Sequence, residues 1–127
     1  MKNTYYLLIL FFLPLIFVNT SFSQIEVFTA NDTNITVTAG EQFSVSLESN
    51  PTSGYSWAIR ISEGADKILI IGSEFAKTKP GRQGEGGEQP WRFKALSTGD
   101  IKLDLIYIRP WEKEEPAKTI TFYVKVE

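Results

Sequence analysis

The chain has 127 residues, contains no cysteine and no histidine, and carries a formal net charge of -2. These absences exclude disulfides, thiolate nucleophiles, zinc–thiolate sites, imidazole metal sites and the Ser-His-Asp triad. The near balance of 13 basic and 15 acidic residues argues against a nucleic-acid-binding protein, which would carry a basic face.

Residues 1–23 have the pattern of a secretory signal peptide. Lys2 is their only charged residue, and the apolar run at residues 5–18 is shorter than the ~20 residues of a membrane span. A small residue, Ser23, precedes the expected cleavage point. We therefore expect a secreted or periplasmic mature protein of residues 24–127, without membrane association after cleavage. An uncleaved N-terminal anchor is the alternative.

Alternation of apolar and polar residues dominates the rest of the chain and is typical of strands with one buried face. Phe43, Val45 and Leu47, for example, fall on one face of a predicted strand. The unbroken apolar run at residues 68–71 predicts a fully buried strand. The predicted strands are residues 25–28, 35–38, 42–48, 55–60, 68–71, 73–77, 91–96, 101–107 and 120–126.

Many short strands without helical periodicity favour a single all-β domain, an immunoglobulin-like β-sandwich of about seven to eight antiparallel strands. Lettering the strands A to G places the B–C loop at residues 50–54, the D–E loop at residues 80–90 and the F–G loop at residues 109–116. In such a sandwich these three loops lie at one end. We therefore expect the binding residues to gather there.

The B–C and D–E loops each have a binding and a structural interpretation. In the B–C loop, Pro51 and Gly54 predict a stiff turn with a small tip, which could also be an ordinary tight turn. The D–E loop is rich in glycine, but no helix follows it and Glu85 would repel an anion, which argues against a phosphate site. A backbone contact with a partner and a simple hairpin tip both remain open.

The F–G loop combines Arg109 and Trp111, two residue types enriched at interface hot spots. The alternative is that Trp111 folds back onto the sandwich rim. Glu112, Glu114 and Glu115 follow, but they lack calcium-loop spacing, so we predict a solvated loop and no metal site or cofactor.

Asn31 and Asn34 each begin an N-glycosylation pattern. The pattern is relevant only if the chain is made in a eukaryote, so it makes no prediction about the fold or the loops.

Three loop motifs of this chain resemble those of the chagasin family of cysteine-peptidase inhibitors. The family pattern is Asn-Pro-Thr-Thr-Gly followed by an aromatic residue, then Gly-x-Gly-Gly, then Arg-Pro-Trp. One departure is Ser53, which replaces the second threonine, keeps its hydroxyl and loses a methyl group. The matching residues are Asn50, Pro51, Thr52, Ser53, Gly54 and Tyr55, then Gly84, Glu85, Gly86 and Gly87, then Arg109, Pro110 and Trp111.

The resemblance implies an immunoglobulin-like fold and tight, reversible inhibition of papain-like cysteine peptidases, with no catalytic residue in the inhibitor. The B–C tip would lie against the catalytic cysteine. The D–E glycines would follow one wall of the cleft, and the Arg-Pro-Trp motif would grip the other. We expect the free protein to be monomeric.

Two other functions are weighed against inhibition. A non-inhibitory adhesion or carbohydrate-binding module would use exposed aromatic residues, but the small B–C tip suits a narrow cleft better than a sugar platform. An enzyme would need a carboxylate pair from Glu85, Glu88 and Glu112, which are predicted on loops without a pocket.

Overall fold

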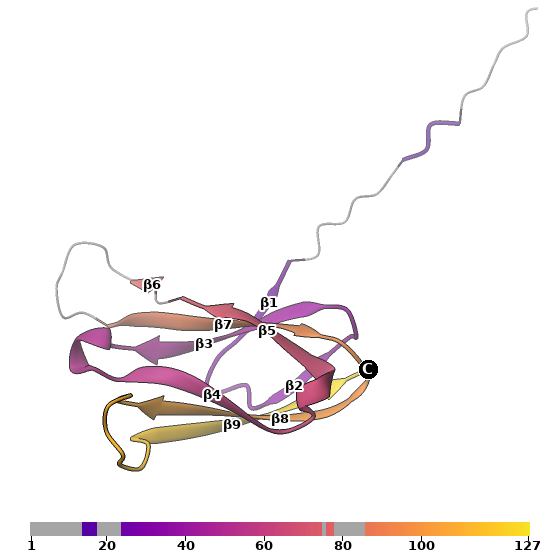
Figure 1. Ribbon diagram of the computed structural model, residues 1–127. Coiled ribbons are helices and arrows are strands. Elements are labelled where there is room, and N and C mark those ends of the chain that lie inside the picture. The colour runs from indigo at the N-terminus through magenta and orange to yellow at the C-terminus, as the bar shows by residue number, and fades with distance from the viewer. Residues whose placement is uncertain (1–13, 18–23, 75, 78–85) are drawn as a thin grey trace, which may run out of the picture.

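The computed structural model describes residues 14–17, 24–74, 76–77 and 86–127, and its strands form a two-layer β-sandwich (Figure 1). The all-β sandwich expected from the sequence is confirmed. No helix in this described part of the chain is long and apolar enough to cross a bilayer. The elements are β1 (Glu26–Phe28), β2 (Asn34–Val37), β3 (Gln42–Ser49), η1 (Pro51–Ser53), β4 (Ser56–Glu63), η2 (Ala65–Lys67), β5 (Ile68–Ser73), β6 (Ala76–Lys77), β7 (Gly87–Ala95), β8 (Gly99–Ile108) and β9 (Lys118–Val126).

The strands of the described residues are divided between a five-stranded and a four-stranded sheet. The first has the order β1-β3-β7-β5, with β6 pairing separately with β7, and the second has the order β2-β9-β8-β4. The nine strands of the described residues match the nine predicted segments; the expected number of seven to eight counted the two early segments, and likewise residues 68–71 and 73–77, as one strand each. Of the expected strand at residues 73–77, residue 75 lies outside the described residues.

Two strand pairs are parallel, whereas the sequence led us to expect antiparallel pairs throughout. β1 runs parallel to β3, and β2 runs parallel to β9. The cause is the turn after β1, in which Asp32 donates its backbone N–H to the carbonyl of Thr29 and accepts the Thr29 N–H on its carboxylate, each at 3.0 Å. The chain reverses at this turn and crosses from the first sheet to the second. β1 and β2 therefore run in opposite directions, and each lies parallel to its neighbour, β3 or β9.

The core lies between the sheets and contains the inward residues of the alternating strands. Phe43, Val45 and Leu47 are buried as predicted, and the ring of Phe43 stacks on Phe93 with a centroid distance of 5.2 Å. Among the residues whose burial is described, the other buried apolar ones are Ile35, Val37, Trp57, Ile68, Ala95, Ile101, Leu103, Leu105, Phe122, Val124 and Val126. Since the chain has no disulfide, this packing holds the sandwich together.

The prediction of a fully buried strand at residues 68–71 is wrong. Ile68 is buried, but Leu69, Ile70 and Ile71 are 51%, 38% and 46% exposed. β5 is the edge strand of its sheet, and a register shift between Ile70 and Gly72 interrupts its pairing with β7. Apolar composition alone does not distinguish such an edge from a central strand.

The expected D–E loop at residues 80–90 is also wrong at its C-terminal end, because β7 already begins at Gly87. Pro90 lies within this strand, opposite Ser46 of β3. On the other side of β7, the pairing with β6 ends at Glu88 and the pairing with β5 begins at Trp91. Pro90 thus lies where the partner strand changes, a position that tolerates the missing N–H.

Candidate functional site

The B–C loop, the F–G loop and the start of β7 lie at one end of the sandwich (Figure 1). β3 ends at Ser49, directly before the B–C loop, and Ser49 pairs with Gly87 at the start of β7. Ser56, which follows the B–C loop, pairs with Ile108, which precedes the F–G loop. The strand registers therefore bring three chain segments of distant sequence position to one surface.

The B–C loop is a short 3-10 turn held by its own polar side chains. The side-chain Oδ1 of Asn50 accepts hydrogen bonds from the backbone N and the Oγ1 of Thr52, at 3.3 and 2.6 Å. Ser53 donates its Oγ to the carbonyl of Asn50 at 2.6 Å and accepts the Tyr55 N–H at 3.3 Å. The Ser53 hydroxyl therefore makes the contacts of the loop itself, and these do not need the methyl group of a threonine.

The tip of the loop points outward. Pro51, Thr52 and Ser53 are exposed, whereas Gly54 and Tyr55 are half-buried. The side chains at the tip are small, and their orientation is fixed by the internal hydrogen bonds. The result is a narrow, stiff projection.

Gly54 brings the B–C and F–G loops into contact. Its φ of 83° lies in the left-handed region, and a Cβ placed on it would lie 2.6 Å from Cη2 of Trp111. The Trp111 ring therefore lies directly against the backbone at Gly54, yet 69% of the residue is exposed. Trp111 packs beside the B–C tip and does not enter the sandwich core.

Arg109 links the same two loops through its guanidinium group. Nε donates to the carbonyl of Ser53 at 3.1 Å, and the guanidinium carbon lies 4.4 Å from the centroid of the Tyr55 ring. Nη1 donates to the carboxylate of Glu112 at 3.1 Å. The prediction that Glu112 belongs to a merely solvated loop is wrong, because its half-buried carboxylate holds Arg109 in place. The Arg-x-x-Glu spacing in the sequence is the pattern from which this ion pair could have been predicted.

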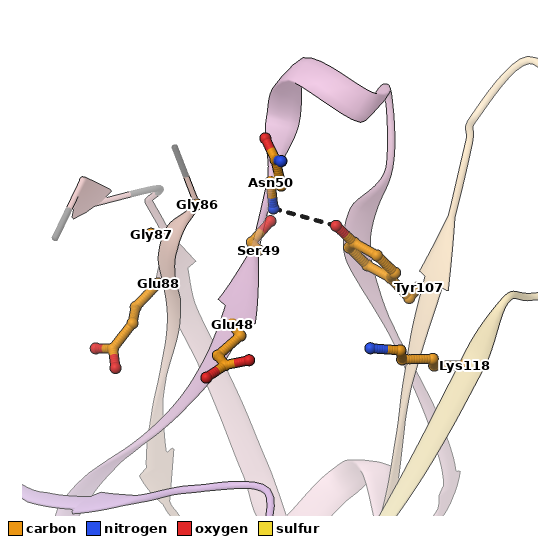
Figure 2. Close-up of a pocket in the computed structure, with 8 residues that line it drawn as sticks. All are labelled: Glu48, Ser49, Asn50, Gly86, Gly87, Glu88, Tyr107 and Lys118. Atoms are coloured by element: carbon orange, nitrogen blue, oxygen red, sulfur yellow. Dashed lines mark hydrogen bonds between the residues drawn. The ribbon is translucent and has the colours of Figure 1, made fainter. Parts of the chain in front are cut away.

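Tyr107 lies beneath both loops, and no motif in the sequence pointed to it. Its hydroxyl accepts the backbone N–H of Asn50 at 3.1 Å (Figure 2). Its ring stacks on Tyr55 with a centroid distance of 5.2 Å and contacts Trp57 at 4.8 Å. A column of three stacked side chains, those of Arg109, Tyr55 and Tyr107, thus runs from the F–G loop to the C-terminal end of β8.

Gln89 joins the two sheets below the loops. Its side-chain amide accepts the backbone N–H of Trp57 and donates to the Trp57 carbonyl, both at 3.1 Å. The same amide donates to Ser73 Oγ at 3.0 Å. The Trp57 indole also donates to the Glu48 carbonyl at 2.8 Å. These bonds tie β4 to the opposite sheet at the end where the loops begin.

The D–E motif is only partly described. Gly84 and Glu85 lie outside the described residues, whereas Gly86 is exposed and Gly87 is buried at the start of β7. A cavity of about 400 Å³ lies between this segment, the end of β3, Tyr107 and Lys118 (Figure 2). It borders Asn50, the residue at which the B–C loop begins.

Of the three carboxylates considered for catalysis, Glu88 and Glu112 are described, and each already has a polar partner. Glu88 accepts a hydrogen bond from Ser46 Oγ at 3.1 Å, and Glu112 is bound by Arg109. Within the described ranges, no three acidic side chains are grouped closely enough to hold a metal ion.

The chain belongs to the chagasin family of peptidase inhibitors. The model of the chagasin family peptidase inhibitor I42 matches residues 36–126. The resemblance seen in the loop motifs is thereby confirmed. The family assignment makes the chain an inhibitor and not an enzyme.

Individual relatives agree with this assignment. Amoebiasin-1 of Entamoeba histolytica is 35% identical over 98 residues, which cover 76% of this chain and 93% of that protein. The cysteine protease inhibitor EhICP2 of Entamoeba histolytica has a TM-score of 0.70 at 25% identity, covering 81% of this chain and 96% of its own. PbICP-C, solved in complex with falcipain-2, shares the fold, with a TM-score of 0.61 at 19% identity over 82% and 92% of the two chains.

Replacing Gly54 by alanine is expected to displace the Trp111 ring from the B–C loop. The left-handed φ alone costs roughly 1–2 kcal/mol. The new methyl group would also overlap the ring. The loss of stability is measured by urea unfolding and the ring position by the Trp111 indole resonance in NMR spectra.

Gly40→Ala is the matched control, because Gly40 has a φ of 91° and open space around the added Cβ. It should show only the loss of stability that the left-handed φ causes, with an unchanged Trp111 resonance. An unchanged resonance in Gly54→Ala as well would contradict the contact.

Proposed function

We propose that this protein is an exported inhibitor of papain-like cysteine peptidases, whose three loops occlude the catalytic cleft. The observation that carries the proposal is the wedge formed by the B–C tip and Trp111, which are held together at Gly54. Thr52 and Ser53 stand at its exposed edge. Such a wedge suits a narrow cleft and needs no reactive group of its own.

Preset loops favour tight binding because their ordering cost is met during folding rather than on association. The hydrogen bonds of Asn50 fix the tip, and the Arg109 contacts fix the F–G loop against it. Gly54 has no Cβ that would displace the Trp111 ring from the tip. The D–E segment, from Gly84 to Gly87, would follow one wall of the cleft.

The exposed indole of Trp111 supplies the anchor on the other wall, together with Arg109 and Pro110. A tryptophan offers a large contact area for few rotatable bonds. Tryptophan is enriched among interface hot spots, so an exposed indole at this end of the sandwich supports a partner that covers it.

Two structurally similar proteins support cysteine peptidases as the target class. EhICP2 is itself a cysteine protease inhibitor, and PbICP-C forms a complex with falcipain-2. The carbohydrate-binding alternative has less support, because the B–C tip offers no flat aromatic platform.

Folded protein is expected to inhibit papain and other papain-like peptidases competitively, and to leave a serine peptidase such as trypsin active. The measurement is the inhibition constant from steady-state assays at several substrate concentrations. Lack of inhibition across several papain-like enzymes would refute the proposal, and glycan binding without any effect on peptidases would favour the alternative.

Trp111→Ala should weaken inhibition by about 2 kcal/mol or more, or roughly 30-fold, as expected for a hot-spot residue. The control is Leu96→Ala, an exposed apolar residue that follows β7 at the opposite end of the sandwich. Equal inhibition constants for Trp111→Ala and the unmodified protein would remove Trp111 from the interface.

Export predicts that the mature protein begins at Gln24. Expression of the whole chain in a secreting host should release a product whose intact mass corresponds to residues 24–127. A product that retains Met1 in the membrane fraction would instead indicate an uncleaved anchor. Gel filtration of the mature protein tests the expected monomer.

A further inference from the structure

We propose that Tyr107 is a positioning residue that holds the B–C and F–G loops in their inhibitory arrangement without touching the peptidase. The inference rests on the proposed function and extends it to a residue outside the three loop motifs. It is carried by the two separate contacts that Tyr107 makes, one through its hydroxyl and one through its ring.

The hydroxyl contact fixes the root of the B–C loop. Asn50 is the first residue beyond the β3–β7 ladder, which ends at Ser49, and its N–H is donated to the Tyr107 hydroxyl of β8 (Figure 2). The other polar groups of Asn50 shape the tip, because its carbonyl and side chain bind Ser53 and Thr52. Holding the Asn50 N–H therefore orients the residue on which the tip is built.

The ring contact extends to the F–G loop. Tyr55, at the far end of the B–C loop, stacks on the Tyr107 ring, and the Arg109 guanidinium covers Tyr55. One side chain on β8 thus supports both ends of the B–C loop and, through Arg109, the segment that carries Trp111.

Tyr107 itself lies behind the exposed tip. It is half-buried, and the cavity of about 400 Å³ borders it on the side of Lys118 (Figure 2). Because this cavity admits water, loss of the hydroxyl leaves the Asn50 N–H solvated and the sandwich core intact. Positioning of the loop and stability of the fold can therefore be separated by experiment.

The test is Tyr107→Phe, which keeps the ring and removes only the acceptor. The matched control is Tyr123→Phe, which makes the same change on an exposed ring of β9. Association and dissociation rates with papain are measured by stopped-flow inhibition. Amide hydrogen exchange at Asn50, Thr52 and Gly54 and the melting temperature are measured on the free proteins.

Tyr107→Phe should lower the association rate constant about threefold to tenfold, the equivalent of one hydrogen bond, because a smaller fraction of the free protein holds the competent loop. The dissociation rate constant and the melting temperature should stay close to those of the unmodified protein. Exchange at Asn50 should accelerate. Tyr123→Phe should change none of these quantities.

Three outcomes would overturn the inference. Unchanged association and exchange would make the hydroxyl irrelevant, a loss confined to dissociation would make Tyr107 a contact residue, and a large fall in melting temperature would make it structural. The exchange measurement needs no peptidase, so it decides the role of Tyr107 even if the unmodified protein fails to inhibit papain. Inhibition by the unmodified protein with unaltered Tyr107→Phe behaviour would refute this inference alone.

Discussion

The hydrogen bonds of Trp57 and Gln89 hold the two sheets in register at the end of the sandwich that carries the loops. The Trp57 indole reaches the β3 carbonyl of Glu48, and the Gln89 amide of β7 bonds both backbone groups of Trp57 on β4. These strands lead into and out of the B–C loop and out of the D–E segment. In a chain without disulfides, the bonds and the core beneath them set the spacing between the loop roots.

The candidate site is built in layers on this tie. The apolar core provides stability. Tyr107 of β8 holds the root of the B–C loop through its hydroxyl. The polar contacts of Asn50 and Arg109 then fix the shape of the tip. Individually the outer contacts are weak, because exposed hydrogen bonds compete with water. Together they restrict the loops before any partner arrives, which is the property that an inhibitor acting by occlusion requires.

Local patterning accounts for what the sequence predicted and for what it missed. Alternation identified the inward face of β3 because one face of that strand is buried, but it could not show that residues 68–71 lie at a sheet edge. The loop motifs located the candidate site. Tyr107 and Gln89 were missed because their partners lie 57 and 32 residues away, and only strand register brings such residues together. Glu112 lies three residues after Arg109, a spacing that indicates an ion pair, but we interpreted it only as part of an acidic stretch.

The direction of β9 separates the loops of the candidate site from the C-terminus. The strand begins at Lys118, beside the F–G loop, and ends at Val126, which pairs with Gly99 at the far end (Figure 1). Its 9 residues span about 30 Å at the usual rise of a strand. A fluorophore, a carrier domain or a solid support joined to Glu127 would therefore leave the wedge facing solution, so the protein can be immobilised with its loop end free.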